Sequence, residues 1–325
     1  MNIAGSTGVV NGVYVKKIIC LLLLVFSAAG CGKPGSGDKL RVAATIFPYY
    51  DFAKNIGGEH AEAVMVIPPG TDPHRYKPVK ADIRKISGCD ILIYNGSGLE
   101  PWINDVLKSI DTSGMIIINA SDVAGKRIIS VKPDSRIDES GEMNEIPPAG
   151  IDPHIWLDFE IDALVINEIL KSMCAKDPAD FDYYNSNTGF YRIRLSQLEI
   201  KYKETLAQDN NRTILYSGHS TFGYMARKYR LKQYSPYRDY SSLPDATQRS
   251  IAGISVRAGN MGAGCIFCEE LSDMKVAKAI TGQSGMKILL LHGCHNVSQE
   301  EFDSGIDFVG IMDRNLENLI TGMKY

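Results

Sequence analysis

The sequence predicts an α/β fold made of two α/β lobes, each with a mainly parallel sheet, joined by one long rigid helix. Short β-rich runs alternate with amphipathic segments from Leu40 onward, and this pattern restarts after residue 207. An unbroken helical periodicity lies between the two parts. The 325 residues also exceed one ordinary core and suffice for two domains of roughly 140 residues each.

The first lobe is expected over residues 40–178. Runs of apolar and β-branched residues predict its strands, at Leu40–Phe47, Glu62–Ile67, Asp90–Tyr94 and Met115–Asn119. Amphipathic periodicity predicts helices between them, most clearly at Val79–Ser87 and Leu99–Ile110. The segment Gly125–Gly150 is rich in Pro, Ser and acidic residues, so we expect a surface loop there.

The linking helix is expected over residues 179–207. Its apolar side chains recur at steps of three, four or seven, at Phe181, Tyr184, Tyr191, Leu195, Leu198, Tyr202 and Leu206. Such a helix runs on the order of 40 Å at 1.5 Å per residue, and a continuous helix resists bending. We therefore expect the two lobes to move little relative to one another.

The second lobe is expected over residues 208–325, where the α/β pattern returns. Its predicted strands are Arg212–Ser217, Gly264–Glu269 and Lys287–Leu291, and its predicted helices are Thr221–Tyr229, Met274–Ile280 and Ile306–Met323. Cys265 and Cys268 fall within one strand at a spacing that puts them on opposite faces. We interpret them as buried strand cysteines rather than a redox or zinc pair.

The N-terminus has the layout of an export signal. Lys16 and Lys17 precede the apolar run Ile18–Phe26, which is too short to cross a bilayer as a permanent helix. Small residues then lead directly into Cys31, so residues 1–31 resemble a bacterial lipoprotein signal with Cys31 as the lipidated residue. A conventional cleaved signal is the alternative. Residues 32–39 are expected to form a flexible tether.

Composition excludes some function classes. A hydrophobic content of 44%, a charged content of 22% and a net charge of −3 are typical of a foldable globular protein. No basic patch or nucleic-acid motif is present in the sequence, so we expect no nucleic-acid partner.

Three of the six histidines lie in turns between predicted strands and helices. His74 and His154 each end the tripeptide Asp-Pro-His, and His219 lies in Ser217-Gly218-His219. Proline fixes φ, so the first two imidazoles project from stiffened loops, as a metal ligand should. Three neutral imidazoles suit zinc and leave a fourth position for a carboxylate or water. The alternative for each one is a hydrogen-bonded loop or core histidine.

The chain resembles the zinc- and manganese-binding lipoproteins of bacterial ABC importers over essentially all of residues 40–325. The motifs that carry this resemblance are Phe47–Ala53, Ile56–Gly58, Pro68–His74, Asn95–Trp102, Asp152–Trp156, Gly218–His219, Phe222–Tyr224, Leu291–Asn296 and Met312–Leu319. The resemblance implies a metal held between the two lobes. His74 and His154 match the ligand positions of the first lobe and His219 that of the second.

Histidine at the second-lobe position is typical of zinc-type members, whereas manganese-type members have glutamate there. Nitrogen ligands also bind zinc more tightly than manganese. We therefore expect Zn²⁺ as the transported ion, with Mn²⁺ as the less favoured choice. The implied function is capture of this ion outside the cytoplasm and its delivery to the membrane permease of an ABC importer, by a monomer attached to the membrane through its lipid.

Two departures from the family pattern concern the site. The family often supplies an acidic fourth ligand near the start of the last helix, but the aligned residue is Ile306, with Asp307 next. Asp307, His295 or water remain open as the fourth ligand, and Glu269 is expected to be structural. The Gly125–Gly150 loop also contains no histidine, unlike the histidine-rich loop of many zinc-type members.

Two other functions would also use such residues. An exported zinc-dependent hydrolase needs three histidines and an open position, but the sequence has no His-Glu-x-x-His and no obvious general base. A surface adhesin would use the metal only to stabilise its fold. We expect a binding protein and not an enzyme.

Overall fold

A four-stranded parallel sheet organises the first part of the chain, in the order β2-β1-β3-β4. The computed structural model describes Met1 and residues 39–131, 150–207, 213–237, 239–240, 246–282 and 284–323. The strands are β1 (Leu40–Ala44), β2 (Ala61–Met65), β3 (Ile91–Tyr94) and β4 (Ile116–Asn119). Val42 and Ala44 face the largest apolar core and Ala43 faces a smaller one, so helices cover both faces of the sheet.

Helices and short turns connect these strands. The α-helices are α2 (Phe47–Gly57), α3 (Lys80–Ser87), α4 (Ile103–Ser109), α5 (Ala120–Ala124) and α6 (Phe159–Lys176). The 3₁₀ turns are η1 (Pro73–Arg75), η2 (Gly125–Arg127), η3 (Ile155–Leu157) and η4 (Pro178–Asp180). The short strands β5 (Ser130–Val131) and β6 (Gly150–Ile151) pair antiparallel.

The first predicted strand was too long, because a helix begins at Phe47. Proline lacks a backbone N–H but suits the first turn of a helix, and Pro48 occupies that turn of α2. Helix α6 was not identified from the sequence. It contacts α2, α5 and α7, so apolar residues lie on several of its faces and its periodicity is weak.

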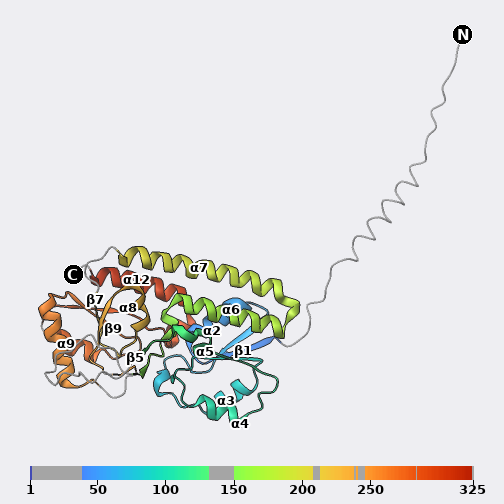
Figure 1. Cartoon of the computed structure of the whole chain (residues 1–325), viewed down its shortest axis with the longest axis horizontal. Coiled ribbons are helices and arrows are strands. Elements are labelled where there is room, and N and C mark those ends of the chain that lie inside the picture. Colours follow the sequence, from blue (N-terminus) through green and yellow to red (C-terminus); the bar gives the residue numbers. More distant parts are fainter. Residues whose placement is uncertain are drawn as a thin grey trace. The chain divides into compact units, whose positions relative to one another are not determined.

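The predicted long helix is present as α7 (Phe181–Ala207). Its periodic side chains are buried from Tyr184 to Leu206, whereas Phe181 is half-exposed. Helix α7 packs against α2 and α6 and also against α8 (Gly223–Tyr229) and α12 (Phe308–Met323) (Figure 1). It therefore joins the two parts of the chain along its length.

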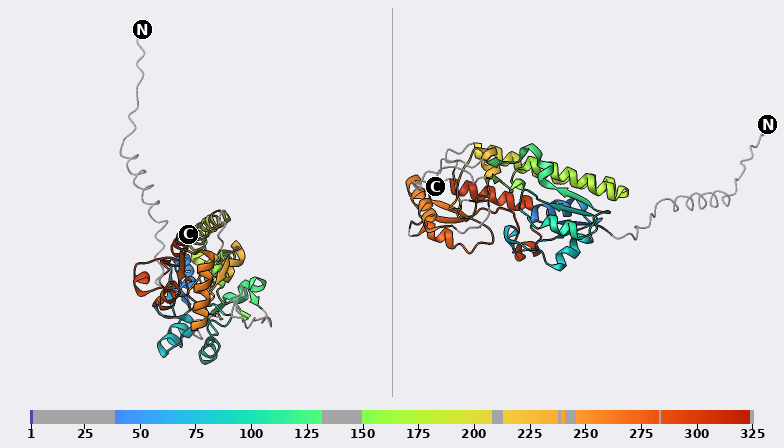
Figure 2. Two further views of the ribbon diagram at one scale, coloured as in Figure 1. Left: turned by 90° about the vertical axis from the view of Figure 1, so that its left-hand side faces the viewer. Right: turned by 60° about the horizontal axis from the view of Figure 1, so that its bottom comes forward.

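The second part of the chain contains two parallel strand pairs. They are β7 (Thr213–Leu215) with β8 (Lys232–Tyr234), and β9 (Cys265–Cys268) with β10 (Lys287–Leu290). A bridge between Tyr216 and Phe267 connects the pairs. The remaining helices are α9 (Gln248–Met261), α10 (Lys275–Thr281) and α11 (Gln299–Asp303), and the views of Figure 1 and Figure 2 show α12 beside α7.

The α/β class, the parallel sheets and the long helix are confirmed. Cys265 and Cys268 are buried free cysteines of one strand, and they belong to different core clusters, as expected for opposite faces. The lobe boundaries stay a prediction, since residues 39–325 form one compact unit and its largest core cluster includes side chains from both parts.

Several predictions fall outside the described residues. These are the signal with Cys31, most of the tether and most of the Gly125–Gly150 loop. Among the described residues, no helix has both the length and the apolar character that spanning a bilayer requires.

Candidate metal centre

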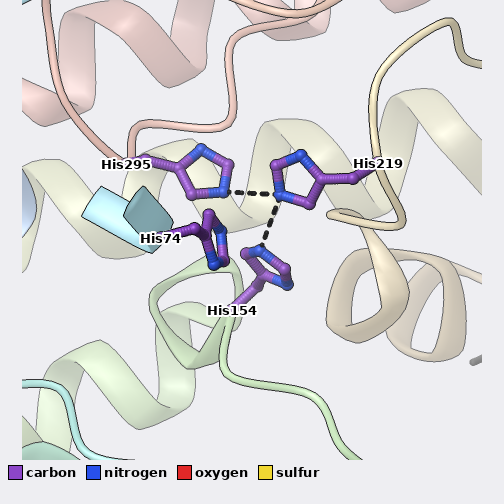
Figure 3. A group of neighbouring side chains, drawn as sticks. All are labelled: His74, His154, His219 and His295. Carbon is purple, nitrogen blue, oxygen red and sulfur yellow. Dashed lines mark hydrogen bonds between the residues drawn. The ribbon is translucent and has the colours of Figure 1, made fainter. Parts of the chain in front are cut away.

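Four histidines converge at one point, as Figure 3 shows. One ring nitrogen from each of His74, His154, His219 and His295 lies within 4.8 Å of the other three. Nε2 of His219 lies 3.2 Å from Nε2 of His154 and 3.1 Å from Nε2 of His295. Ligands at about 2.0–2.1 Å from a tetrahedral zinc lie roughly 3.3 Å apart, so this spacing suits one shared ion.

The loops that carry these histidines come from well separated elements. His74 lies in η1 beyond β2, His219 follows β7 and His295 follows β10. Loops at the carboxyl ends of parallel strands meet at one edge of a sheet, where α/β proteins bind ligands. His154 lies directly before η3 and is fully buried. The three histidines singled out in the sequence are therefore brought together, and His295 lies with them.

Each Asp-Pro-His turn is fixed by its own aspartate. Asp72 Oδ1 accepts a hydrogen bond from the His74 backbone N–H at 2.9 Å, and Asp152 Oδ1 accepts one from the His154 backbone N–H at 3.0 Å. Asp152 Oδ1 also lies 2.7 Å from Nδ1 of the His154 ring. This second contact leaves Nε2 of His154 free to point at the centre.

Carboxylates stand behind two further rings. Glu270 Oε1 lies 2.9 Å from Nδ1 of His295, and Glu269 Oε1 lies 2.6 Å from Nδ1 of His219. A carboxylate on the far nitrogen fixes the tautomer of a metal-binding imidazole and raises its basicity. Nε2 of His74 is buried and has no hydrogen-bond partner among the described residues. A bound cation would satisfy this atom.

Electrostatics keeps part of the quartet neutral. Burial and neighbouring histidines lower the pKa of His74 and of His154 well below the ordinary value, which favours the neutral, ligating form. Burial also opposes a charge on His219, but the Glu269 carboxylate outweighs it and raises the pKa of His219. His219 is therefore the ring of these three that acid protonates first.

Asp307 lies outside this quartet. Its Oδ1 accepts the Gly310 N–H at 2.7 Å near the start of α12, and its Oδ2 lies 2.5 Å from Arg194 on α7. Both contacts stabilise the start of the last helix. Of the open choices for a fourth ligand, His295 is the protein side chain that the fold places beside the other three.

The remaining two histidines and Trp156 lie around the centre or away from it. His292 is buried, and its Nδ1 accepts the Cys294 N–H at 2.9 Å. Trp156 is a buried core aromatic and donates to the Gly293 carbonyl at 2.7 Å. His60 is partly exposed, with Nδ1 lying 2.6 Å from Asp180. The signal for His295 in the sequence was its position just after a strand, which it shares with His219.

Comparison with known proteins also indicates a zinc-binding protein. Residues 42–322 match the sequence model of the family described as zinc-uptake complex component A, periplasmic (ZnuA). The chain is 29% identical over 314 residues to the high-affinity zinc uptake system protein ZnuA of Bacillus subtilis, over 95% of this chain and 96% of that protein. It is also 29% identical over 291 residues to the zinc-binding protein AdcA of Streptococcus pyogenes, but spans only 55% of AdcA.

Solved structures share the fold. The metal-dependent lipoprotein YcdH of Bacillus subtilis aligns with a TM-score of 0.69 at 27% identity, over 87% of this chain and 99% of YcdH. The periplasmic zinc-binding protein TroA of Treponema pallidum aligns with a TM-score of 0.72 at 19% identity, over 88% and 99% of the two chains. Because the family model covers nearly the whole region from β1 to α12, this chain belongs to the ZnuA family of zinc-uptake components.

Proposed function

We propose that this chain captures Zn²⁺ outside the cytoplasm and delivers it to the permease of an ABC-type importer. The observation that carries the proposal is the convergence of four histidine nitrogens within 4.8 Å of one another. The zinc-uptake and zinc-binding relatives support the same ion. Attachment through lipidated Cys31 and a monomeric state are part of the proposal.

The proposed ligands are His74, His154 and His219, with His295 in the fourth position in place of Asp307. Four neutral nitrogen donors favour zinc over manganese, which prefers oxygen ligands. Mn²⁺ is accordingly the less favoured cargo. The negative charge that compensates the ion comes from Asp152, Glu269 and Glu270, which contact the rings rather than the centre.

Four protein ligands also favour a binding protein over an enzyme. A catalytic zinc keeps one position open for water or substrate, whereas four imidazoles close a tetrahedral site. The hydrolase alternative would need one of the four rings to leave. The adhesin alternative, with a structural metal, would make the fold depend on zinc.

We propose that the ion first meets His74 and His154, and that the approach of His219 then completes the site with His295 and excludes water. Release follows when contact with the permease draws the His219 loop away from the His154 loop. The histidines lie in loops, whereas α7 and the sheets hold these loops in place. Small loop displacements therefore suffice to open the site.

Elemental analysis of the purified, tag-free chain, followed by competitive chelator titration, tests the function. We expect one zinc per chain, removable by chelator without loss of helical circular dichroism and restored by added Zn²⁺. Unfolding on chelation would support the structural-metal alternative, and hydrolysis of ester or peptide probes by the zinc form would support the enzyme. A chain that retains no zinc and binds none would refute the proposal.

A further inference from the structure

Asn296 links the loop of His295 to the loop of His74. Its Nδ2 donates to the Pro68 carbonyl at 2.7 Å and to the Thr71 carbonyl at 2.9 Å. The Gly70 N–H adds a third hydrogen bond, to the Val297 carbonyl at 2.7 Å. We call these three hydrogen bonds the strap. They join two chain segments separated by more than 200 residues.

The strap holds a defined turn. Thr71 N–H donates back to the Pro68 carbonyl at 3.3 Å, and Gly70 has a φ of 77°, as the third residue of a type II turn requires. The carbonyls at the two ends of this turn are the two that Asn296 contacts. The amide therefore fixes the whole turn and not one atom of it.

Asn296 itself is immobilised. It is 1% exposed, and its Oδ1 accepts the Val297 N–H at 2.8 Å, which orients Nδ2 toward the turn. A buried amide with both its donors and its acceptor satisfied is costly to displace, because displacement leaves polar atoms unpaired.

The two ends of the strap lie beside ligands. Asn296 directly follows His295, and Thr71 comes three residues before His74. The side chain of Asp72 fixes the backbone N–H of His74. The rings of His74 and His295 lie with their centroids 5.2 Å apart. The strap fixes the distance between the backbone segment before His74 and the segment after His295. This distance determines whether both rings can reach a common ion.

We infer that Asn296 is a positioning residue, which holds His74 and His295 at ligating distance before the metal arrives. The inference rests on the proposed function, since it concerns zinc at the same site. It predicts that two of the four ligands form a preassembled pair. The strap must also loosen, or the His154 and His219 side must open, when zinc leaves.

Two variants of Asn296 test the inference. Asn296→Ala removes all the side-chain contacts, and the nearly isosteric Asn296→Asp keeps an acceptor for Val297 N–H but cannot donate to the turn. Both are expected to bind Zn²⁺ roughly 10-fold to 100-fold more weakly, the range for partners that orient metal ligands, and to release it faster to a chelator. Asn318→Ala is the matched control, because Asn318 Nδ2 also donates to a carbonyl, that of Leu290, at 2.9 Å.

A double-mutant cycle separates positioning from general destabilisation. In a His74→Ala background the strap has no His74 ring to hold, so Asn296→Ala should cost little further affinity. Equal losses in both backgrounds would overturn the inference. Hydrogen exchange of the Gly70 amide in the zinc-free wild type needs no variant at all. Protection is expected, and free exchange would also overturn the inference.

These outcomes are distinct from failure of the proposed function. If the wild type binds no zinc, the function itself is wrong. If the wild type binds zinc and both Asn296 variants bind it equally well, only the strap inference is wrong.

Discussion

The two Asp-Pro-His turns have the same sequence but different surroundings. Asp152 is fully buried and contacts both the backbone and the ring of His154. The Asp72 side chain is 39% exposed, caps the His74 turn and faces Arg75 at 3.6 Å. Asn95 also donates to the Pro153 carbonyl at 2.8 Å, within the first part of the chain, whereas the segment before His74 is held by Asn296 from the second part.

This difference shows that one repeated motif can support two mechanical roles. The His154 turn is fixed by its own aspartate and by Asn95 of the same part of the chain. Tyr224 of the second part also donates to the Asp152 carbonyl at 3.0 Å. The His74 turn is capped by Asp72, and the turn before it is held by Asn296 from the other side of the site. The His154 ring is therefore fixed by a buried carboxylate of its own turn, whereas the turn before His74 depends on Asn296 of the second part.

The largest expected effect is loss of a ligand. His154→Ala should abolish tight zinc binding and leave the fold intact. Structural zinc sites with four ligands bind with about 10–16 kcal/mol, so one ligand is worth on the order of a hundredfold to a thousandfold in affinity. Competitive chelator titration measures the loss, and circular dichroism checks the fold. Unaltered affinity would remove His154 from the site.

The aspartates of the two turns allow a matched comparison. Asp152→Ala removes the partner of the His154 ring and should weaken zinc binding roughly 10-fold to 100-fold. Asp72→Ala removes the cap of η1 and should cost less affinity, because Asn296 still holds the preceding turn. Zinc affinities of both variants check this. Equal losses would mean that the two turns are not mechanically different.

Much of the fold could be predicted because the strands are short apolar runs and the buried side chains of α7 recur at helical spacing, although Phe190, Ile193 and Ile200 of this helix are exposed. The start of α4 could not be predicted. The sequence pattern begins at Leu99, but the helix begins at Ile103, after a loop in which buried Glu100 accepts the Asn95 and Gly96 N–H groups. That loop depends on tertiary contacts, which periodicity does not encode.

The site was predictable to a similar degree. Turns at strand ends identified His74, His154 and His219 as candidates. Their spacing in the sequence, however, could not show whether the three rings meet. Asp307 and His295 were both open as the fourth ligand. What distinguishes them is the cap that Asp307 provides to α12 and its ion pair with Arg194, which only the folded chain shows.

The pH dependence of zinc binding sharpens the contrast among the rings. The raised pKa of His219 means that a proton must be displaced from this ring as pH falls through that pKa, so affinity should fall by up to about tenfold per pH unit. Because the pKa of His74 and of His154 is lowered, protons compete with zinc for these two rings only at lower pH. Chelator titrations from about pH 7.5 to pH 5 measure this slope. An affinity that does not change over this range would exclude histidine ligands.

The smallest expected effect concerns Asp307. Asp307→Asn keeps an oxygen that can accept the Gly310 N–H but removes the ion pair with Arg194, which is partly exposed on α7. We expect a loss of at most about 1 kcal/mol in the free energy of unfolding and zinc affinity within about twofold of the wild type. His295→Ala, by contrast, should weaken zinc binding about as much as His154→Ala, because both remove one of four nitrogens. Chelator titration of the two variants side by side decides the fourth ligand, since a large loss with Asp307→Asn and none with His295→Ala would reverse the assignment.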